Sequence, residues 1–151
     1  MKSKKILILF VLIIFAFFCF FFLNNLAFKL NPEIKKVKIA EKVINIELVI
    51  TPEEREKGLS GRENIGENDG MLFVFENSGR HGFWMKDMMF PIDIVWLDQS
   101  KKIIFIQKNV LPSTYPEIFY PDDNANYVLE LISGFAEKNN LQIGNQVKFL
   151  P

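Results

Sequence analysis

The feature that most constrains this chain is an uninterrupted apolar run near its N-terminus. The run begins at Ile6 and ends at Leu23, and none of its 18 side chains is charged or strongly polar. Lysines 2, 4 and 5 precede it, and the first acidic residue of the chain is Glu33. Eighteen residues form about 27 Å of helix, close to the hydrocarbon thickness of a bilayer, and lysines before the span favour a cytoplasmic N-terminus. We therefore expect one membrane-spanning helix that holds the rest of the chain outside the cytoplasm.

Two other interpretations of this run stay open. A cleaved signal peptide, which would leave the domain secreted or periplasmic, has a shorter apolar core and a small-x-small cleavage site. Only Ala27 is well placed for such a site, and Asn25 lies two residues before it. A lipid-modified Cys19 is the third interpretation, but the residues just before it include no suitably placed small side chain. The favoured interpretation is an uncleaved anchor, in which Cys19 is a lipid-facing apolar residue.

The rest of the chain has the size and composition of one globular domain. We place the anchor at residues 1–29 and the domain at residues 30–151, which is long enough for one core and short for two. This portion holds 14 basic and 18 acidic residues, and a net charge of about −4 does not favour nucleic-acid binding. It holds no cysteine, so disulfides, thiol nucleophiles and cysteine-based zinc sites are excluded within it.

The spacing of apolar residues predicts many short strands in this domain. Between Ile44 and Ile50, apolar residues recur at every second position, which is the period of a half-buried strand. Residues 71–75 form a continuous apolar run, which is typical of a buried strand. We predict strands over residues 36–40, 43–50, 71–75, 82–86, 92–97, 102–107, 126–132 and 146–150.

Two short helices are predicted between these strands. Thr51 is a good N-cap, Pro52 suits the first helical position, and Glu54 completes a capping box. Ser133 is expected to cap a second helix that ends near residue 139, whereas residues 111–124 hold three prolines and predict a long irregular loop. Together these elements predict an α+β, mostly β domain with a compact, curved, largely antiparallel sheet or small barrel.

The familiar catalytic patterns are missing. The sequence has no glycine-rich phosphate loop, no nucleophile elbow and no metal-binding helix with two histidines. The only histidine, His81, lies in residues 77–82, which look like an exposed turn, so we interpret it as a surface residue. We predict no metal and no cofactor.

The stretch from Phe83 to Lys86 is the strongest candidate for part of a site. In a strand, Trp84 and Lys86 face the same way. Trp84 beside a cation would then form a flat binding wall with a charged end. The alternative is that Trp84 packs in the core and that Lys86 lies at the edge of that core.

Charged residues elsewhere extend this candidate site. Asp93 lies between apolar neighbours, so its carboxylate must be paired, hydrogen-bonded or solvated, with Lys86, Arg55 or Arg62 as partner. Arg55 and Arg62, on and after the first helix, either grip a carboxylate or phosphate by forked hydrogen bonds or tie the helix to the sheet. Glu130 is either part of a solvated face or a site acid. The candidate ligand-binding residues are Arg55, Arg62, Trp84, Lys86, Asp93 and Glu130.

A set of short motifs gives the domain a family resemblance. In chain order the motifs are Thr51-Pro52-Glu53-Glu54-Arg55, Gly58-Leu59, Arg62, Gly70-Met71-Leu72-Phe73-Val74-Phe75, Phe83-Trp84-Met85-Lys86, Pro91-Ile92-Asp93-Ile94, Tyr127-Val128-Leu129-Glu130-Leu131, Gly134 and Gly144. In order and spacing the chain resembles the DUF192 family from about residue 38 to residue 150. The resemblance implies a compact, mostly β domain, often behind a signal peptide or anchor in small prokaryotic proteins, and it implies no activity. His81 lies outside the family pattern, and residues 111–124 lack the cysteines that relatives often carry there.

These observations leave three functional hypotheses. The first is a membrane-tethered, extracytoplasmic module that binds a small ligand or an envelope protein, and an anionic or sugar-like ligand would suit an aromatic wall beside basic groups. The second is an enzyme in which Asp93 or Glu130 is the general acid or base, while Lys86 or an arginine stabilises negative charge. The third is a purely structural envelope protein. An open cleft lined by the candidate residues favours a site, and burial of those residues in ion pairs favours a structural role.

Overall fold

The computed structural model describes residues 14, 15, 18 and 34–151. The chain divides into two compact units, Met1–Glu33 and Ile34–Pro151. Ile14, Phe15 and Phe18 are helical, and the remainder of the predicted membrane span lies outside the described residues. Within the described part of the chain, no helix is both long and apolar enough to span a bilayer. The anchor therefore stays a prediction.

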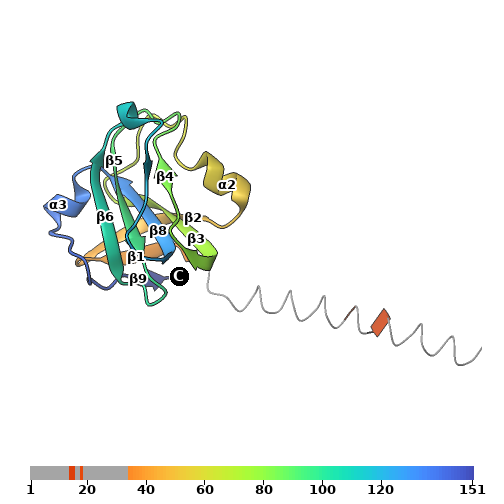
Figure 1. Ribbon diagram of the computed structural model, residues 1–151. Coiled ribbons are helices and arrows are strands. Elements are labelled where there is room, and N and C mark those ends of the chain that lie inside the picture. The colour runs from red at the N-terminus through yellow and green to blue at the C-terminus, as the bar shows by residue number, and fades with distance from the viewer. Residues whose placement is uncertain (1–13, 16–17, 19–33) are drawn as a thin grey trace, which may run out of the picture. The chain divides into compact units, whose positions relative to one another are not determined.

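The second unit is built on one curved sheet of seven strands that curls into a half-barrel (Figure 1). The strand order is β6-β5-β8-β3-β2-β1-β9, and β4 and β7 form a separate two-stranded ribbon. The strands are β1 Lys36–Ile39, β2 Lys42–Val49, β3 Asp69–Gly79, β4 Phe83–Trp84, β5 Ile92–Leu97, β6 Ile103–Val110, β7 Ile118–Phe119, β8 Ala125–Ile132 and β9 Lys148–Leu150. The helices are α2 Pro52–Lys57, α3 Phe135–Lys138 and a 3-10 turn, η1 Pro112–Thr114. The predicted mostly β domain with two short helices is confirmed.

One pair of strands departs from the antiparallel pattern. β2 and β3 run parallel in the register Asn45 to Asp69, whereas every other neighbouring pair of the main sheet is antiparallel. Parallel neighbours need a crossover connection, and the segment containing α2 supplies it. The two edges of the sheet approach each other where Lys102 bridges Gln146 and where the Ile103 amide donates to the Asn145 carbonyl at 2.9 Å.

The sheet buries a core on each face. On β8, Leu129 and Leu131 point into a core that α3 covers, whereas Val128 points into a second core that includes Leu59, just after α2. Figure 1 shows α3 and α2 on opposite sides of the domain. Because successive side chains of a strand point to opposite faces, Glu130, between the two leucines, points to the α2 side.

The first helix begins as the sequence predicts. The Thr51 hydroxyl accepts a hydrogen bond from the Glu54 amide (3.2 Å), and the Glu54 carboxylate accepts one from the Thr51 amide (3.0 Å). This reciprocal capping box satisfies two amides that the first helical turn leaves unpaired. The helix ends at Gly58, whose φ of 47° suits a residue without a side chain. The start and the end of α2 are therefore specified by its local sequence.

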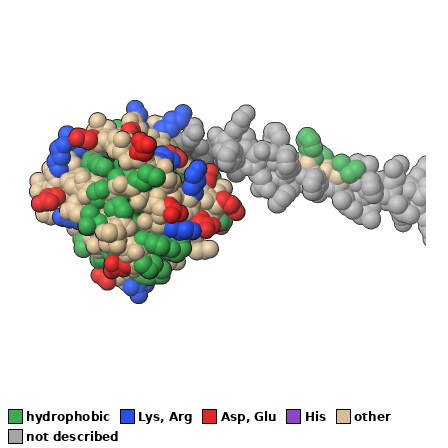
Figure 2. Space-filling model, turned by 90° about the horizontal axis from the view of Figure 1, so that it is seen from above, with side chains coloured by type: hydrophobic (Ala, Val, Ile, Leu, Met, Phe, Trp, Pro, Cys, Tyr) green, Lys and Arg blue, Asp and Glu red, His purple; other side chains and the backbone are tan. Residues whose placement is uncertain are grey.

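The upper end of the domain carries the small β4–β7 ribbon and the loops beside it. The loop predicted over residues 111–124 contains η1 and β7. A Cβ atom on Gly82 would lie 2.5 Å from the Tyr120 ring and 2.7 Å from an Ile118 methyl group, so the ribbon requires a glycine there. Seen from above, apolar side chains gather over the middle of this end and charged side chains lie around them (Figure 2).

Candidate functional site

A pocket of about 280 Å³ opens between the second half of α2 and β4. We call it the α2–β4 pocket. It lies on the α2 side of the sheet, and β8 forms its floor. The lining residues are Arg55, Glu56, Lys57, Gly58, Leu59, Ser60, Phe75, His81, Gly82, Phe83, Trp84, Met88 and Glu130.

Glu130 is the only acid in the floor of this pocket. It lies on a central strand, opposite Met71 of β3 and Ile94 of β5, so its carboxyl group rises between apolar neighbours. The side chain is 5% exposed, and its Oε2 atom is fully buried without a hydrogen-bond partner. Nearly all buried polar atoms in folded proteins have such a partner, so this one requires an explanation.

The burial of Glu130 changes its charge state. Loss of solvent raises the pKa of this carboxyl to about 8, although the positive charge of Arg62 acts in the opposite direction. The side chain therefore keeps its proton at neutral pH. A neutral carboxyl group carries one O–H donor and a carbonyl acceptor, so the floor of the pocket can donate a hydrogen bond to a ligand.

Arg55 forms a rigid part of the pocket wall. Its Nη1 atom donates to the carbonyls of Ile50 (2.8 Å) and Val74 (2.9 Å), and its guanidinium lies 5.0 Å from the centre of the Phe75 ring. Its Nε and Nη2 atoms donate to no group among the described residues. Both functions proposed for Arg55 from the sequence are therefore compatible with its position, since it ties the helix to the sheet and keeps donors for a ligand.

His81 lies beside Arg55, which the sequence did not indicate. Its ring stacks on Phe75, with centroids 3.5 Å apart and planes inclined by 9°, and its Nε2 atom lies 3.1 Å from the Asn77 carbonyl. Burial lowers the pKa of His81, against the opposing effect of that carbonyl, so the imidazole is neutral at neutral pH. Residues 77–82 are mostly exposed, as the sequence predicted, but β3 continues to Gly79 in place of a turn, and His81 is half-buried against Phe75.

A second pocket adjoins the first across this aromatic stack. Its volume is about 260 Å³, and it shares Arg55, Phe75 and His81 with the α2–β4 pocket. The remaining lining includes Ile50 and Pro52, at the start of α2. The stack therefore stands between two hollows, with the guanidinium of Arg55 in the wall of both.

The aromatic wall opposite α2 comes from β4. Phe83 packs edge-on against Phe73 (centroids 4.8 Å apart) and Trp96 (5.9 Å), which anchors it in the core. Trp84, the next residue, pairs with Ile118 of β7 and remains 43% exposed. Trp84 therefore lines the pocket and is not packed in the core, and its role as a flat binding wall stays a prediction.

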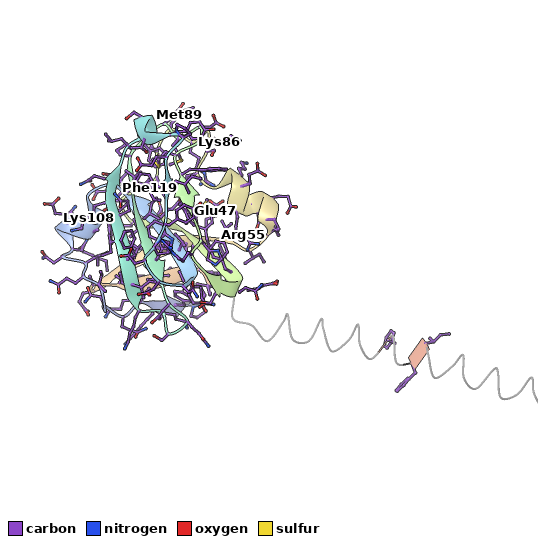
Figure 3. All side chains as sticks on the ribbon, viewed as in Figure 1. Glu47, Arg55, Lys86, Met89, Lys108 and Phe119 are labelled. Carbon is purple, nitrogen blue, oxygen red and sulfur yellow. The ribbon has the colours of Figure 1, made fainter. Side chains whose placement is uncertain are left out.

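Lys86 does not line this pocket. β4 ends at Trp84, so the strand alternation that predicted a shared face does not reach Lys86. The Lys86 carbonyl instead accepts a hydrogen bond from the Ser60 hydroxyl at 2.7 Å, and Figure 3 shows its side chain at the upper end of the domain, away from Arg55. The basic residue at the rim of the pocket is Lys57, the last residue of α2.

Arg62 also stays outside the α2–β4 pocket. Its Nη2 atom donates to both carboxylate oxygens of Glu47 at 2.7 Å, a pair that is partly exposed. The charge of Arg62 still acts on Glu130, whose pKa it lowers. Glu47 therefore takes the place of the ligand carboxylate or phosphate that the sequence suggested for Arg62.

Asp93 lies on the opposite face of the sheet from Glu130. Glu130 is opposite Ile94 in the register, so the neighbouring Asp93 points to the α3 side, where it is fully buried. Its oxygens accept hydrogen bonds from the amides of Asn109 and Ala136, both at 2.8 Å. The predicted ion pair with Lys86, Arg55 or Arg62 is therefore wrong, because backbone amides satisfy this carboxylate.

The bond to Ala136 also explains how α3 begins. The N-cap is Gly134, in a left-handed conformation (φ 85°) that provides no side chain, and the Asp93 carboxylate caps the helix from β5 instead. Ser133, predicted as the cap, donates to the Asn109 side chain at 2.5 Å. Asp93 therefore has a structural position, and the structure brings together only Arg55, Trp84 and Glu130 of the predicted site residues.

The pocket and fold can be compared with known proteins. The sequence pattern of DUF192, described as "Uncharacterized ACR", matches residues 34–149. The chain belongs to the DUF192 family. A crystal structure of a "putative transcription regulator" from Sinorhizobium meliloti 1021 matches with a TM-score of 0.70 and 26% identity, over 76% of this chain and 90% of that one.

A second solved structure is similar to the DUF192 domain. It is a protein of unknown function from Novosphingobium aromaticivorans DSM 12444, with a TM-score of 0.71 and 27% identity, over 75% of this chain and 83% of that one. No curated protein matches the chain. The described residues contain no group of three or more His, Cys, Asp or Glu side chains that could hold a metal ion.

Proposed function

We propose that this DUF192 domain is a small-ligand-binding module, tethered at the outer face of the membrane by residues 6–23, and that its ligand occupies the α2–β4 pocket. The observation that carries this proposal is the unpartnered carboxyl of Glu130 in the pocket floor. An unsatisfied polar group in a core destabilises the fold, and such groups persist where function requires them. No described residue bonds to this carboxyl, and a ligand that bonds to its pocket-side oxygen gives it a hydrogen-bond partner.

The shape and lining of the pocket support the same conclusion. A hollow of about 280 Å³ suits a small metabolite, and its wall combines aromatic side chains with few polar groups. Arg55 is held by two backbone carbonyls before any ligand arrives, so little side-chain entropy is lost on binding. An envelope assembly role or a purely structural role gives no reason for an acid at the bottom of an open pocket.

A second candidate function follows from the same residue. The pKa of Glu130, raised to about 8, lies near the pH at which a general acid or base is most effective. Asp93 cannot share that role, because it points to the other face of the sheet and both its oxygens bind amides. An enzyme at this pocket would therefore depend on Glu130 alone among the buried acids.

Nucleic acid is not part of the proposal. The transcription-regulator description belongs to the Sinorhizobium protein, and this chain has an acidic excess from residue 30 onward. Phosphate backbones are bound by surfaces rich in lysine and arginine, and the α2–β4 pocket offers only Arg55 and Lys57.

The test is a thermal-shift screen of small metabolites on the full chain in detergent. A ligand that binds only the folded state raises the melting temperature by mass action. Trp84→Ala should abolish the shift, and Ile143→Ala, which removes another exposed apolar side chain outside the pocket, should leave it unchanged. Equal loss in both variants, or no shift with any compound, contradicts the proposal. Conversion of a hit into a product, lost in Glu130→Gln, would establish the enzyme instead.

The tether has its own test. In intact cells, an accessible epitope at the C-terminus should be cleaved by external protease once the outer permeability barrier is opened, and the chain should sediment with membranes. Recovery of the intact chain among soluble cytosolic proteins would contradict the tether and leave the pocket unaffected.

A further inference from the structure

We infer that the α2–β4 pocket selects an anionic ligand, a carboxylate or a phosphate group carried on a flat apolar body, with Arg55 and Glu130 as its two donors. This inference rests on the proposed function and specifies the ligand class of the same pocket. It chooses one of the two ligand classes that the sequence left open, the anionic one over the sugar-like one.

The fixed charges around the pocket favour an anion. Arg55 and Lys57 contribute two positive charges, and Glu56, an exposed residue of α2, contributes the one ionised carboxylate that lines it. A carboxylate in a pocket of this kind would normally balance such cations. Glu130 does not, because it is buried away from them without an ion-pair partner and keeps its proton.

Arg55 is prepared to bind an anion. Two of its five N–H donors go to the carbonyls of Ile50 and Val74, which fixes the plane of the guanidinium. The Nε and Nη2 donors are unused among the described residues and belong to a group in the pocket wall. A guanidinium held in one orientation loses little entropy when it forms a charge-assisted bond with a carboxylate or phosphate.

Glu130 contributes a donor from the floor. Its Oε2 atom is buried in the core and has no hydrogen-bond partner. The carboxyl can therefore donate its proton to a ligand only from the other oxygen, which is nearer the pocket. A neutral carboxyl donates a strong hydrogen bond to an anionic oxygen, whereas it offers a cationic ligand only a neutral carbonyl acceptor and no ion pair. An anion bound beside Glu130 also stabilises the protonated form of its carboxyl group.

The rest of the ligand must be apolar and flat. The wall facing α2 is formed by the rings of Phe83 and Trp84 and by the flexible side chain of Met88. The 43% exposure of Trp84 leaves an indole face available for stacking. A sugar would also stack there, but its hydroxyl groups would need several polar partners in the floor, where Glu130 is the one polar side chain.

The test compares three probes with the same ring and different head groups: benzoate, benzyl alcohol and benzylammonium. The chain contains two tryptophans, so its NMR spectrum in detergent should contain two indole N–H signals. Trp84 reports on the pocket directly, and Trp96, which is buried and donates to the His81 carbonyl at 2.9 Å, reports on the core behind it and should shift less. Benzoate should shift the Trp84 signal with about tenfold higher affinity than the other probes, in the millimolar range expected of fragments.

Matched lysine variants separate local charge from overall charge. Lys57→Gln should weaken benzoate binding several-fold and leave benzyl alcohol unaffected. Lys108→Gln makes the same change at an exposed position on the far side of the domain in Figure 3, and it should leave both affinities unchanged. An equal effect of the two variants on benzoate overturns the inference.

The affinity for benzoate should also depend on pH through Glu130. The ionisable residues that face Glu130 are Arg55, Glu56 and Lys57 from α2, Arg62 from the loop after α2, and His81 from the segment before β4, whereas β3 and β5 present Met71 and Ile94. Ionisation of Glu130 above pH about 8 removes a donor and adds a negative charge, so the affinity should fall up to tenfold per pH unit. In Glu130→Gln the affinity should stay constant over that range. An unchanged pH dependence in this variant overturns the role of Glu130.

The outcomes distinguish the ligand class from the site. N-acetylglucosamine is added as a fourth probe, for the sugar-like class. Stronger binding of benzylammonium, of benzyl alcohol or of N-acetylglucosamine, reported by Trp84, overturns the anionic class and leaves the pocket as the binding site. Failure of all four probes to shift the Trp84 signal overturns both the ligand class and the proposed pocket.

Discussion

The buried acid in the pocket floor predicts an unusual dependence of stability on pH. Glu130 has a folded-state pKa of about 8, against 4.5 for an unperturbed glutamate. Between these values the folded state holds a proton that the unfolded state has released, so the free energy of unfolding falls as pH rises. At about 1.4 kcal/mol per pH unit, the difference between these two pKa values corresponds to about 5 kcal/mol lost between pH 4.5 and pH 8.

The measurement is urea unfolding of residues 34–151, the unit that contains both cores, followed by tryptophan fluorescence at about pH 5, 7 and 9. Glu130→Gln removes the ionisation and should flatten the decline. The difference between wild type and variant isolates Glu130, because both proteins share every other titrating group. His81 acts in the opposite direction, since its lowered pKa contributes stability that is lost as pH falls. Typical domains have 5–15 kcal/mol of stability, so an effect of this size is easily measured.

A second variant provides the same test if Glu130→Gln fails to fold. Glu130→Met removes the polar group and keeps a similar volume between Met71 and Ile94, so it should be more stable than wild type by several kcal/mol at about pH 9. If wild type and both variants lose stability in parallel between pH 5 and 9, the carboxyl is not buried as described and the argument for the pocket fails with it.

Four further substitutions test the structural framework by urea unfolding of the same fragment. Asp93→Ala should destabilise the domain by about 3 kcal/mol or more, because two buried amides lose their acceptor, and a change below about 1 kcal/mol would contradict its capping role. Arg55→Met should lower stability by about 1–3 kcal/mol through the loss of two hydrogen bonds; an unchanged midpoint would show that the guanidinium is not fixed. Gly82→Ala should destabilise by about 1–3 kcal/mol, since its methyl group would overlap side chains of the neighbouring segment, and a neutral effect would refute that close approach. Thr51→Ala should lower stability by about 1 kcal/mol if its hydroxyl caps α2, and no change would argue against the cap.

The elements of the fold were predictable because their signals are local. The capping box at Thr51 and the strand over Ile92–Leu97 depend on neighbouring residues only, and both are found where the sequence placed them. The parallel pairing of β2 with β3 was not predicted, since pairing partners are set by packing across the whole chain. The alternation of apolar residues along a strand also does not reveal which of the two faces of the sheet a given side chain joins.

The candidate site was harder to predict for the same reason. Trp84 and Glu130 were recognised as unusual, but their common pocket arises from strands that are more than 40 residues apart in sequence. Lys86 was misplaced because a two-residue strand ends before it, and Asp93 was misread because its partners are backbone amides, which carry no sequence signal. The sequence around His81 gave no indication that its ring stacks on Phe75.

The pocket combines parts that differ in how firmly they are held. Its floor belongs to β8, which is hydrogen-bonded on both sides to long strands, whereas one of its walls is β4, two residues long and paired only with the equally short β7. Local opening occurs most readily where few contacts hold the backbone. We therefore expect a ligand of this pocket to enter through local opening at the ribbon while the half-barrel stays intact, and substitutions at the exposed Trp84 to change ligand selection with little effect on the fold.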